Sequence, residues 1–144
     1  MSVFRKYILT ILVLLFAWHS SAQEIGKWNV YPSYWNATQN MVAGNMVYSL
    51  CGNNLLAYDT EDTSVRTLNC LEHLNGVHIA CMNYNKQTHT LVLVYTDGGI
   101  DLLNDDGSIH YLPDLKEKAI ANKDVNSVHT EGHMAYLCTG FGYI

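Results

Sequence analysis

The sequence has little positive charge. Lysine and arginine account for only eight of the 144 residues, against 13 aspartate and glutamate residues, which gives a formal net charge of −5. An acidic chain without a basic patch is poorly suited to nucleic acid or to an anionic lipid surface, because both are bound through clustered lysine and arginine. The composition therefore argues against a nucleic-acid partner.

Signatures of catalysis and of cofactor binding are also lacking. The chain has no serine-centred nucleophile elbow, no phosphate-binding loop and no dinucleotide fingerprint. These absences predict that the protein is not an enzyme and carries no cofactor. Disorder is not expected either, because 49% of the residues are hydrophobic and only 15% are charged.

Long hydrophobic runs are limited to one, near the N-terminus. Arg5 and Lys6 precede an apolar run over residues 7–18, which only Thr10 interrupts, and small residues follow it. This order is typical of a secretory signal peptide, and the run is shorter than the roughly 18–20 residues of a membrane span. We therefore predict a signal peptide over residues 1–22 and an exported mature chain with no transmembrane segment. An uncleaved N-terminal anchor is the alternative.

The rest of the sequence predicts short β-strands separated by turns. Residues 46–50 and 55–58 flank a Gly-Asn-Asn turn, which is the pattern of a β-hairpin. A meander of four strands follows over residues 77–112, with Asp-Gly and Asn-Asp turn sequences between its strands. Residues 114–123 are polar and are expected to connect this meander to a further hairpin over residues 125–139.

The β pattern repeats with a period close to 44 residues. Residues 44–48 (GNMVY) match residues 132–136 (GHMAY) 88 positions later, and residues 90–93 (TLVL) fall midway. Four strands in a unit of this length are typical of one β-propeller blade. We therefore predict an all-β fold, a partial β-propeller of about two and a third four-stranded blades. A small β-sandwich or open barrel is the alternative.

The repeat also predicts the domain organisation. The incomplete N-terminal propeller domain would occupy residues 23–144, with blades at about residues 41–68, 77–112 and 125–144 onward. Closed propellers have roughly four to eight blades. The chain is therefore expected to be an N-terminal fragment, or a truncated reading frame, of a longer protein.

Two clusters resemble metal sites only superficially. His129 and His133 have the spacing of a zincin pair, but the intervening TEG sequence predicts a turn between two strands instead of a helix. The acidic residues at 59–62 and 105–106 lack the ligand spacing of a calcium-binding loop. We therefore predict turns at these positions and no metal site.

The cysteines leave the disulfide state open. Cys51, Cys70, Cys81 and Cys138 would permit three pairing schemes in an exported chain. Free or mixed thiols are the other hypothesis, because Cys81 and Cys138 lie within strand patterns and suit a buried core.

Aromatic residues gather at the start of the predicted mature chain, at Trp28, Tyr31, Tyr34 and Trp35. One interpretation is structural: these side chains pack the N-terminal segment against the first blade or complete the last one. The other is functional: they form a surface on which the sugar rings of a glycan stack.

Several stretches of the chain resemble the PorZ-type proteins of Bacteroidetes. They are residues 25–34 (IGKWNVYPSY), 55–59 (LLAYD), 91–103 (LVLVYTDGGIDLL), 113–116 (PDLK) and 135–142 (AYLCTGFG). The resemblance covers nearly all of residues 25–144. It implies an exported protein at the outer-membrane surface, built of two β-propellers and a small C-terminal β domain. This chain would supply only the beginning of the first propeller.

The resemblance also implies a function in type IX secretion. Proteins of this type belong to the attachment complex that contains the sortase PorU with PorV and PorQ. They bind anionic lipopolysaccharide and deliver it to the sortase, as binding and scaffold proteins without enzymatic activity. The alternative is a periplasmic glycan-sensing propeller of a two-component sensor kinase. Blades of that class typically carry a Trp-Phe-Gly-Thr strand, where this chain has residues 137–142 (LCTGFG).

Overall fold

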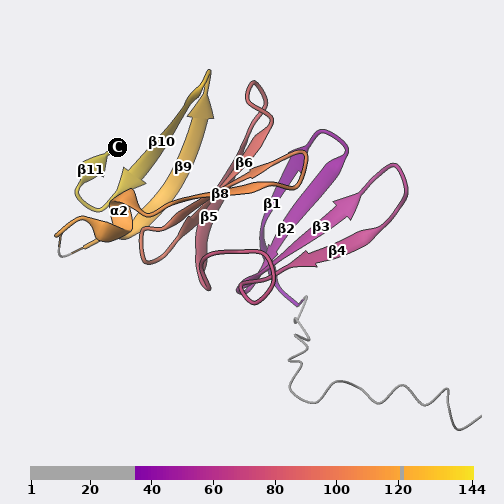
Figure 1. Ribbon diagram of the computed structural model, residues 1–144, viewed down its shortest axis with the longest axis horizontal. Helices are drawn as coiled ribbons and strands as arrows, with labels where there is room; N and C mark the ends of the chain where they lie inside the picture. Colours follow the sequence, from indigo (N-terminus) through magenta and orange to yellow (C-terminus); the bar gives the residue numbers. More distant parts are fainter. Residues whose placement is uncertain (1–34, 121) are drawn as a thin grey trace, which may run out of the picture. The chain divides into compact units, whose positions relative to one another are not determined.

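The computed structural model describes residues 35–120 and 122–144. The predicted signal peptide, residues 1–22, lies outside this part of the chain, as do three of the four aromatic candidates, Trp28, Tyr31 and Tyr34. The regular secondary structure of the described residues is almost entirely β, and the strands form three antiparallel sheets (Figure 1).

The first sheet contains β1 (Ala37–Ala43), β2 (Met46–Cys51), β3 (Asn54–Asp59) and β4 (Val65–Leu68), hydrogen-bonded in sequence order. The predicted hairpin is confirmed, since β2 and β3 pair along their whole length. Alternation of side chains along β3 turns Leu55 and Ala57 into the core, while Tyr58 lies on the opposite, exposed face.

Strand β1 starts at Ala37, ahead of residue 41, where the first blade is predicted to begin. The sequence shows no strand pattern here, because residues 38–40 are all polar and do not alternate with apolar residues, and Asn40 has weak β propensity. Two contacts make them a strand nonetheless. β2 pairs with β1 from end to end, and the Gln39 amide reaches the next sheet. There Nε2 donates to the carbonyl of Met82 at 2.8 Å, and Oε1 accepts from the Met82 N–H at 3.1 Å.

The second sheet contains β5 (Ile79–Asn85), β6 (Thr90–Tyr95), β7 (Ile100–Asn104) and β8 (Ile109–Leu112). It is the predicted four-stranded meander, with each strand paired to the one that follows it in sequence. Gly98 and Gly107 close two of its turns with φ angles of 88° and 85°, a region that glycine enters without steric cost.

The third sheet contains β9 (Val125–Glu131), β10 (Met134–Thr139) and β11 (Gly142–Tyr143), in the order β11-β10-β9. The predicted hairpin closes between Glu131 and Met134. Main-chain hydrogen bonds of 2.9 and 3.1 Å between Leu137 and Ile144 extend the pairing of the last strand. The third sheet is thus more complete than the predicted third of a blade. The connection before it holds a single helical turn, α2 (Asp114–Glu117).

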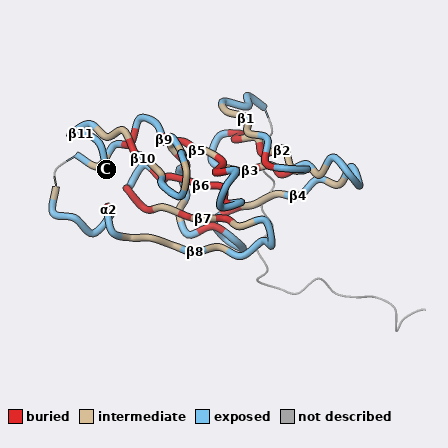
Figure 2. The backbone as a smooth tube through the Cα atoms, turned by 90° about the horizontal axis from the view of Figure 1, so that it is seen from above, coloured by how far each residue is buried: buried red, intermediate tan, exposed pale blue. Residues whose placement is uncertain are grey.

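The second sheet lies between the other two and is buried on both faces (Figures 1 and 2). All six residues of β6 are buried. Leu91, Leu93 and Tyr95 join a core shared with the first sheet, whereas Val92 and Val94 join a core shared with the third sheet. A strand with no polar face fits a sheet that is covered on both sides.

Polar side chains join the innermost strands of the second and third sheets. Asn83 donates to the carbonyl of Val128 at 3.1 Å and accepts from the Thr130 hydroxyl at 2.9 Å, and Asn85 donates to the carbonyl of Gly132 at 2.9 Å. Successive four-stranded sheets that pack face to face, each starting with its innermost strand, are the arrangement of neighbouring propeller blades. The predicted all-β, partial β-propeller fold is therefore confirmed.

Candidate functional site

A groove of about 720 Å³ opens between the first and second sheets, at the end where their hairpin turns lie. Its size falls within the range of about 300–1,000 Å³ that is usual for ligand sites. The β1–β2 turn, the β3–β4 loop and the β7–β8 turn line it together with the ends of the strands next to them. The residues that carry side-chain charge or a hydroxyl there are Tyr48, Asp59, Glu61, Arg66, Thr67, His73, His89, Asp105 and Asp106.

Negative charge dominates this groove. Asp59, Glu61, Asp105 and Asp106 line it with carboxylates, and Arg66 is the basic residue among its lining. Unlike charges attract and like charges repel across a partly enclosed site of this kind more strongly than in bulk water. The groove therefore favours cationic or hydroxyl-rich groups over anionic ones.

Hydrogen bonds within the turns hold two of these carboxylates in place. Asp59 accepts a hydrogen bond from the Glu61 N–H at 2.8 Å, and Asp106 accepts one from the Ser108 N–H at 2.8 Å. The Ser108 hydroxyl donates a second hydrogen bond, of 2.6 Å, to Asp106. Hydrogen bonds from the hydroxyl and the N–H of Ser108 hold the pKa of Asp106 below its ordinary value. Asp59 and Asp106 are turn residues that the sequence predicts, and they also contribute negative charge to the groove.

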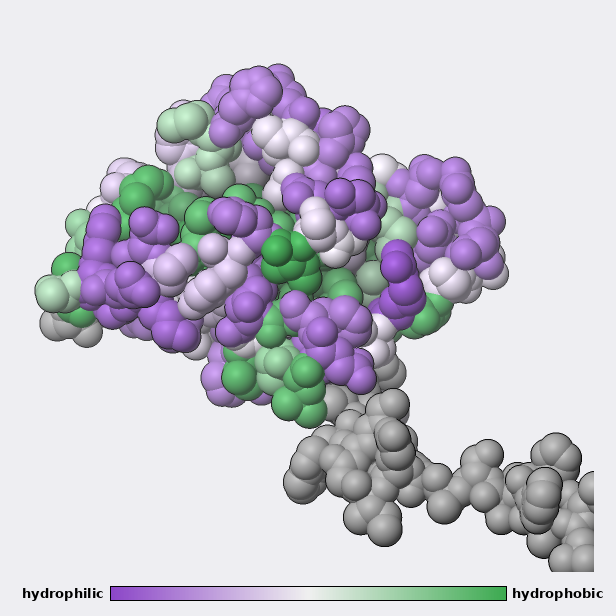
Figure 3. Space-filling model, in the orientation of Figure 1, coloured by the Kyte–Doolittle hydropathy of each residue, from purple (hydrophilic) through white to green (hydrophobic). Residues whose placement is uncertain are grey.

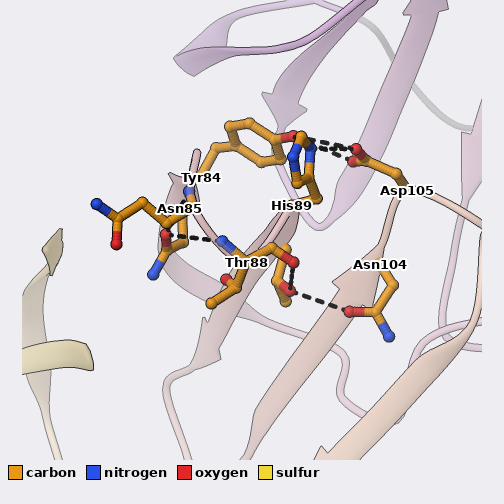
Figure 4. A network of polar contacts seen from close by, with 8 residues as sticks. Tyr84, Asn85, Thr88, His89, Asn104 and Asp105 are labelled. Carbon is orange, nitrogen blue, oxygen red and sulfur yellow. Dashed lines mark hydrogen bonds and ion pairs between the residues drawn. The ribbon is translucent and has the colours of Figure 1, made fainter. Parts of the chain in front are cut away.

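His89 and Asp105, which line the groove, form a network of polar contacts with Tyr84 (Figure 4). The Tyr84 hydroxyl lies 3.2 Å from both carboxylate oxygens of Asp105, and His89 Nδ1 lies 3.0 Å from Asp105 Oδ2. Burial, followed by the negative charge of Asp105, raises the pKa of Tyr84. Tyr84 is buried, whereas the His89 side chain is 68% exposed, so the network runs from the core to solvent.

The backbone around this network is held in an unusual conformation. His89 has a φ of 54°, in the left-handed region that non-glycine residues rarely adopt. An Asx turn at Asn85 and a hydrogen bond of 3.2 Å from the Asp105 N–H to the His89 carbonyl support this conformation. The turn of the second hairpin thereby presents the imidazole to Asp105.

Tyr48 is a buried residue of β2 that lines the groove. Burial is the main reason that the pKa of Tyr48 is raised. The positive charge of Arg66 acts to lower this pKa, and the negative charge of Asp105 acts to raise it further. Arg66 and Asp105 therefore both act on the Tyr48 hydroxyl, from opposite sides of the groove. The arrangement offers hydrogen bonds and charge to a bound group. It does not pair a nucleophile with a base in the manner of acyl-transfer enzymes.

Of the residues singled out by the sequence, Asp59, Glu61, Asp105 and Asp106 line this groove, whereas Trp35, His129 and His133 do not. Trp35, the one aromatic candidate that the structure describes, precedes β1 and is 89% exposed. His129 lies on β9 and His133 in the turn that follows it. Among residues 35–120 and 122–144, no three side chains of metal-ligating type come together.

All four cysteines are free thiols in the structure. Cys51 and Cys81 are buried, Cys138 is half-buried and Cys70 is exposed. Burial, with a smaller contribution from Cys138, raises the pKa of Cys81 to about 11. Cys81 therefore behaves as a small core residue.

The groove itself could not be found from the sequence, because its residues come from six separate stretches, at 43–48, 57–61, 66–68, 73, 89 and 103–107. The only signal was the recurrence of Asp, Asn and Gly in the turns after β3, β5 and β7, and this signal predicts turns equally well.

Comparison with known proteins places the chain in a family. The family model described as "TSS9, PorZ, N-terminal beta-propeller domain" matches residues 47–144. A solved structure of PorZ from Porphyromonas gingivalis, described as an essential bacterial surface component of the type-IX secretion system, superposes with a TM-score of 0.76 at 24% identity. The superposition covers 82% of this chain and only 16% of that one. No curated protein matches by sequence.

The two matches agree with the geometry described above. At 24% identity the solved structure supports the fold alone, and the fold is the same stacked arrangement of sheets. Within residues 35–120 and 122–144, no helix has the length and apolarity to cross a membrane. Since the family model covers more than half of the sequence, this chain belongs to the family of PorZ N-terminal β-propeller domains of the type IX secretion system.

Proposed function

We propose that this chain acts as a non-enzymatic binding and scaffold module in type IX secretion, exported to the outer-membrane surface or the periplasm. The observation that carries the proposal is the family match over residues 47–144. The description of the P. gingivalis relative as a surface component supports export and association with the secretion complex. A rigid stack of sheets that presents loops at its ends is suited to binding.

The finer role that we propose is a part in binding anionic lipopolysaccharide and delivering it to the sortase of the attachment complex. This chain spans 16% of the length of the solved relative, so it would supply one portion of the contact. Two parts of its surface differ in how well they suit such a ligand.

The acidic groove is unsuited to the lipid. Its four carboxylates, Asp59, Glu61, Asp105 and Asp106, would repel phosphate or acidic sugar groups. We assign the lipid contact instead to the segment between β8 and β9. Three of the five described basic residues lie there, at Lys116, Lys118 and Lys123, and the other two are Arg66 and Lys86. Lys116 is engaged by Asp97 at 2.8 Å, which leaves Lys118 and Lys123 to meet the lipid, beside the acidic residues Asp114, Glu117 and Asp124 of the same segment.

A binding experiment separates these surfaces. The chain would be immobilised and titrated with anionic lipopolysaccharide, and separately with a neutral lipopolysaccharide that lacks the acidic groups. The Lys118→Glu/Lys123→Glu variant should weaken anionic binding by at least roughly thirtyfold, because each of the two basic residues near an anionic surface contributes about 1 kcal/mol. Asp106→Asn, in the groove, is the matched control and should not weaken it.

Two results would overturn the lipid role: equal binding of both lipopolysaccharides, or unchanged binding in the double-lysine variant. The scaffold role is tested independently, by asking whether the chain is retained on the purified sortase-containing complex. Failure of retention would count against the scaffold role even if lipid is bound.

A further inference from the structure

The Tyr48 hydroxyl has no hydrogen-bond partner in the described part of the chain, residues 35–120 and 122–144. Tyr48 is only 8% exposed and lines the groove between the first and second sheets. Among the described residues, every fully enclosed side-chain nitrogen or oxygen has a hydrogen bond, so the Tyr48 oxygen is not sealed inside the core. It therefore opens into the groove, where a bound group can hydrogen-bond to it.

Strand pairing places the Arg66 side chain on the same side of the first sheet as this hydroxyl. Tyr48 pairs with Ala57, and Ala57 pairs with Arg66, so the three residues form one row across β2, β3 and β4. Tyr48 and Ala57 belong to the core shared with the second sheet, so the row faces that sheet. The middle residue, Ala57, has the smallest side chain and also lines the groove. The row therefore leaves space between two hydrogen-bond donors, a hydroxyl and a guanidinium.

Carboxylates line the groove from both sheets. Asp59 ends β3 and Glu61 lies in the loop after it, whereas Asp105 and Asp106 lie in the turn between β7 and β8. Figure 3 shows hydrophilic residues over the end of the first sheet where the β3–β4 loop lies. Within the described ranges, none of these four carboxylates forms an ion pair with a lysine or an arginine. Their negative charge is therefore available to a bound cation.

Three of these carboxylates each use one oxygen in hydrogen bonds that hold the loops. Oδ1 of Asp59 accepts from the Glu61 N–H, and Oε1 of Glu61 accepts from Nδ2 of Asn45. Oδ1 of Asp106 accepts from both the N–H and the hydroxyl of Ser108. The second oxygen of each carboxylate has no hydrogen bond to another residue that the structure describes. A cation in the groove can therefore bind these oxygens without breaking a turn.

The combination of acceptors and donors favours a basic peptide over other ligands. Lysine and arginine side chains bind carboxylates, and the carbonyl oxygens of a peptide main chain accept from a hydroxyl and a guanidinium. Successive side chains of an extended peptide point to opposite sides, which matches carboxylates on two sheets. The long, flexible stem of lysine lets its charge reach either side. The ammonium group of an amino sugar sits directly on the ring and lacks this reach.

We propose that the groove binds an extended basic segment of a protein partner, in which two adjacent lysine or arginine residues direct one side chain to the carboxylates of each sheet. Asp59 and Glu61 bind one basic side chain, and Asp106 binds the other. Tyr48 and Arg66 donate hydrogen bonds to main-chain carbonyl oxygens of the segment. This site is separate from the segment between β8 and β9 to which the lipid contact is assigned, so either proposal can fail without the other.

Fluorescence anisotropy of a short labelled peptide, titrated with the full chain, tests the proposal. The peptide carries a central Lys-Lys pair between glycine and serine residues, and a matched peptide carries Gln-Gln instead. The Lys-Lys peptide should bind roughly tenfold more tightly, because each exposed ion pair contributes up to about fivefold. A third peptide, in which one residue separates the two lysines, directs both to the same side and should bind more weakly than the Lys-Lys peptide.

Variants of the chain locate the site. Asp59→Asn/Asp106→Asn removes one negative charge from each sheet but keeps an acceptor oxygen for each turn, and should weaken Lys-Lys binding by roughly tenfold. Tyr48→Phe should weaken it by roughly fivefold and leave the urea midpoint of unfolding almost unchanged, because the hydroxyl has no partner in the described chain. Asp62→Asn, on the same β3–β4 loop but outside the groove lining, is the matched control and should leave binding unchanged. Circular dichroism of each variant checks that the β structure is retained.

Four results would overturn the proposal. Equal binding of the Lys-Lys and Gln-Gln peptides would show that the basic side chains are not recognised. Unchanged binding in the double-asparagine variant would place the peptide elsewhere. Equal losses in Asp62→Asn and in the double variant would show a diffuse attraction to an acidic chain. Displacement of the Lys-Lys peptide by an equal concentration of a glucosamine oligomer would assign the groove to amino sugars instead.

Discussion

The hydroxyl of Tyr95 donates a hydrogen bond to Asp101 Oδ2 inside the second sheet. Asp101 is fully buried and also accepts from the main-chain and side-chain nitrogens of Asn75, both at 2.9 Å. A buried carboxylate is tolerated only when its oxygens are hydrogen-bonded. The pair thereby ties the loop before β5, through Asn75, to the strands β6 and β7.

Replacing Tyr95 by phenylalanine should destabilise the fold. The change leaves Asp101 Oδ2 with one hydrogen bond fewer in the core, at a cost of about 1–3 kcal/mol. Urea denaturation followed by tryptophan or tyrosine fluorescence measures the change in free energy of unfolding. Tyr58→Phe, at a partly exposed position of β3, is the control and should change stability little. Equal stability of the two variants would show that the Tyr95–Asp101 contact is not stabilising.

The ion pair between Asp97 and Lys116, at 2.8 Å, predicts a dependence of stability on pH. Partial burial acts to raise the pKa of Asp97, but hydrogen bonds from Lys116 and from the Gly99 N–H outweigh it, and the pKa is lowered. The stabilisation is therefore present above the ordinary aspartate pKa of 3.8 and is lost as the pH falls through the lower folded pKa.

The contribution of Lys116 to stability should be lost at high pH instead of low pH. Its hydrogen bond to Asp97 raises its pKa, so its contribution is fully present below 10.5 and is lost as the pH rises through the raised value. Urea midpoints measured across the acid range test the carboxylate side. Lys116→Gln should flatten the acid slope relative to the parent chain, whereas Lys86→Gln, an exposed lysine on the β5–β6 turn, should not. An unchanged slope in Lys116→Gln would contradict the assignment.

The network of Tyr84, His89 and Asp105 predicts that the pKa of Tyr84 changes when Asp105 is replaced. Asp105→Asn removes the negative charge beside Tyr84, so the pKa of Tyr84 should fall toward its ordinary value of 10.0 while burial still keeps it raised. Carbon-13 NMR of ring-labelled tyrosine resolves this titration from the others. Asp62→Asn, on the exposed β3–β4 loop, serves as control. The assignment fails if Tyr84 titrates identically in both variants.

The cysteines should differ sharply in reactivity. Cys70 is exposed, whereas Cys81 is buried and has a pKa of about 11, so little reactive thiolate forms there at neutral pH. A maleimide reagent should modify Cys70 first, and Cys81 only after denaturation, as read by mass spectrometry of peptides. Cys70→Ser should abolish the fast phase. Rapid modification of Cys81 in the folded chain would contradict its burial.

Much of the fold could be predicted from local patterns. The hairpin around residue 52 and the meander over residues 77–112 carry alternating or wholly apolar strands between Asp, Asn and Gly turns, and both are confirmed. β1 could not be predicted, because its first half is polar and becomes a strand through its pairing with β2 and the contact of Gln39 with Met82. The groove was missed because its charged residues are far apart in sequence.

Local sequence patterns predicted the strand type, the turn positions, the period of the repeat and the family, since these depend on neighbouring residues and on their spacing. Sheet packing, in contrast, sets which face of each sheet is buried, which carboxylates share a groove and which apolar residues remain exposed. Those features depend on contacts between residues about 40 positions or more apart, such as Gln39 with Met82 and Asn83 with Thr130. Such contacts exist only once the sheets have packed.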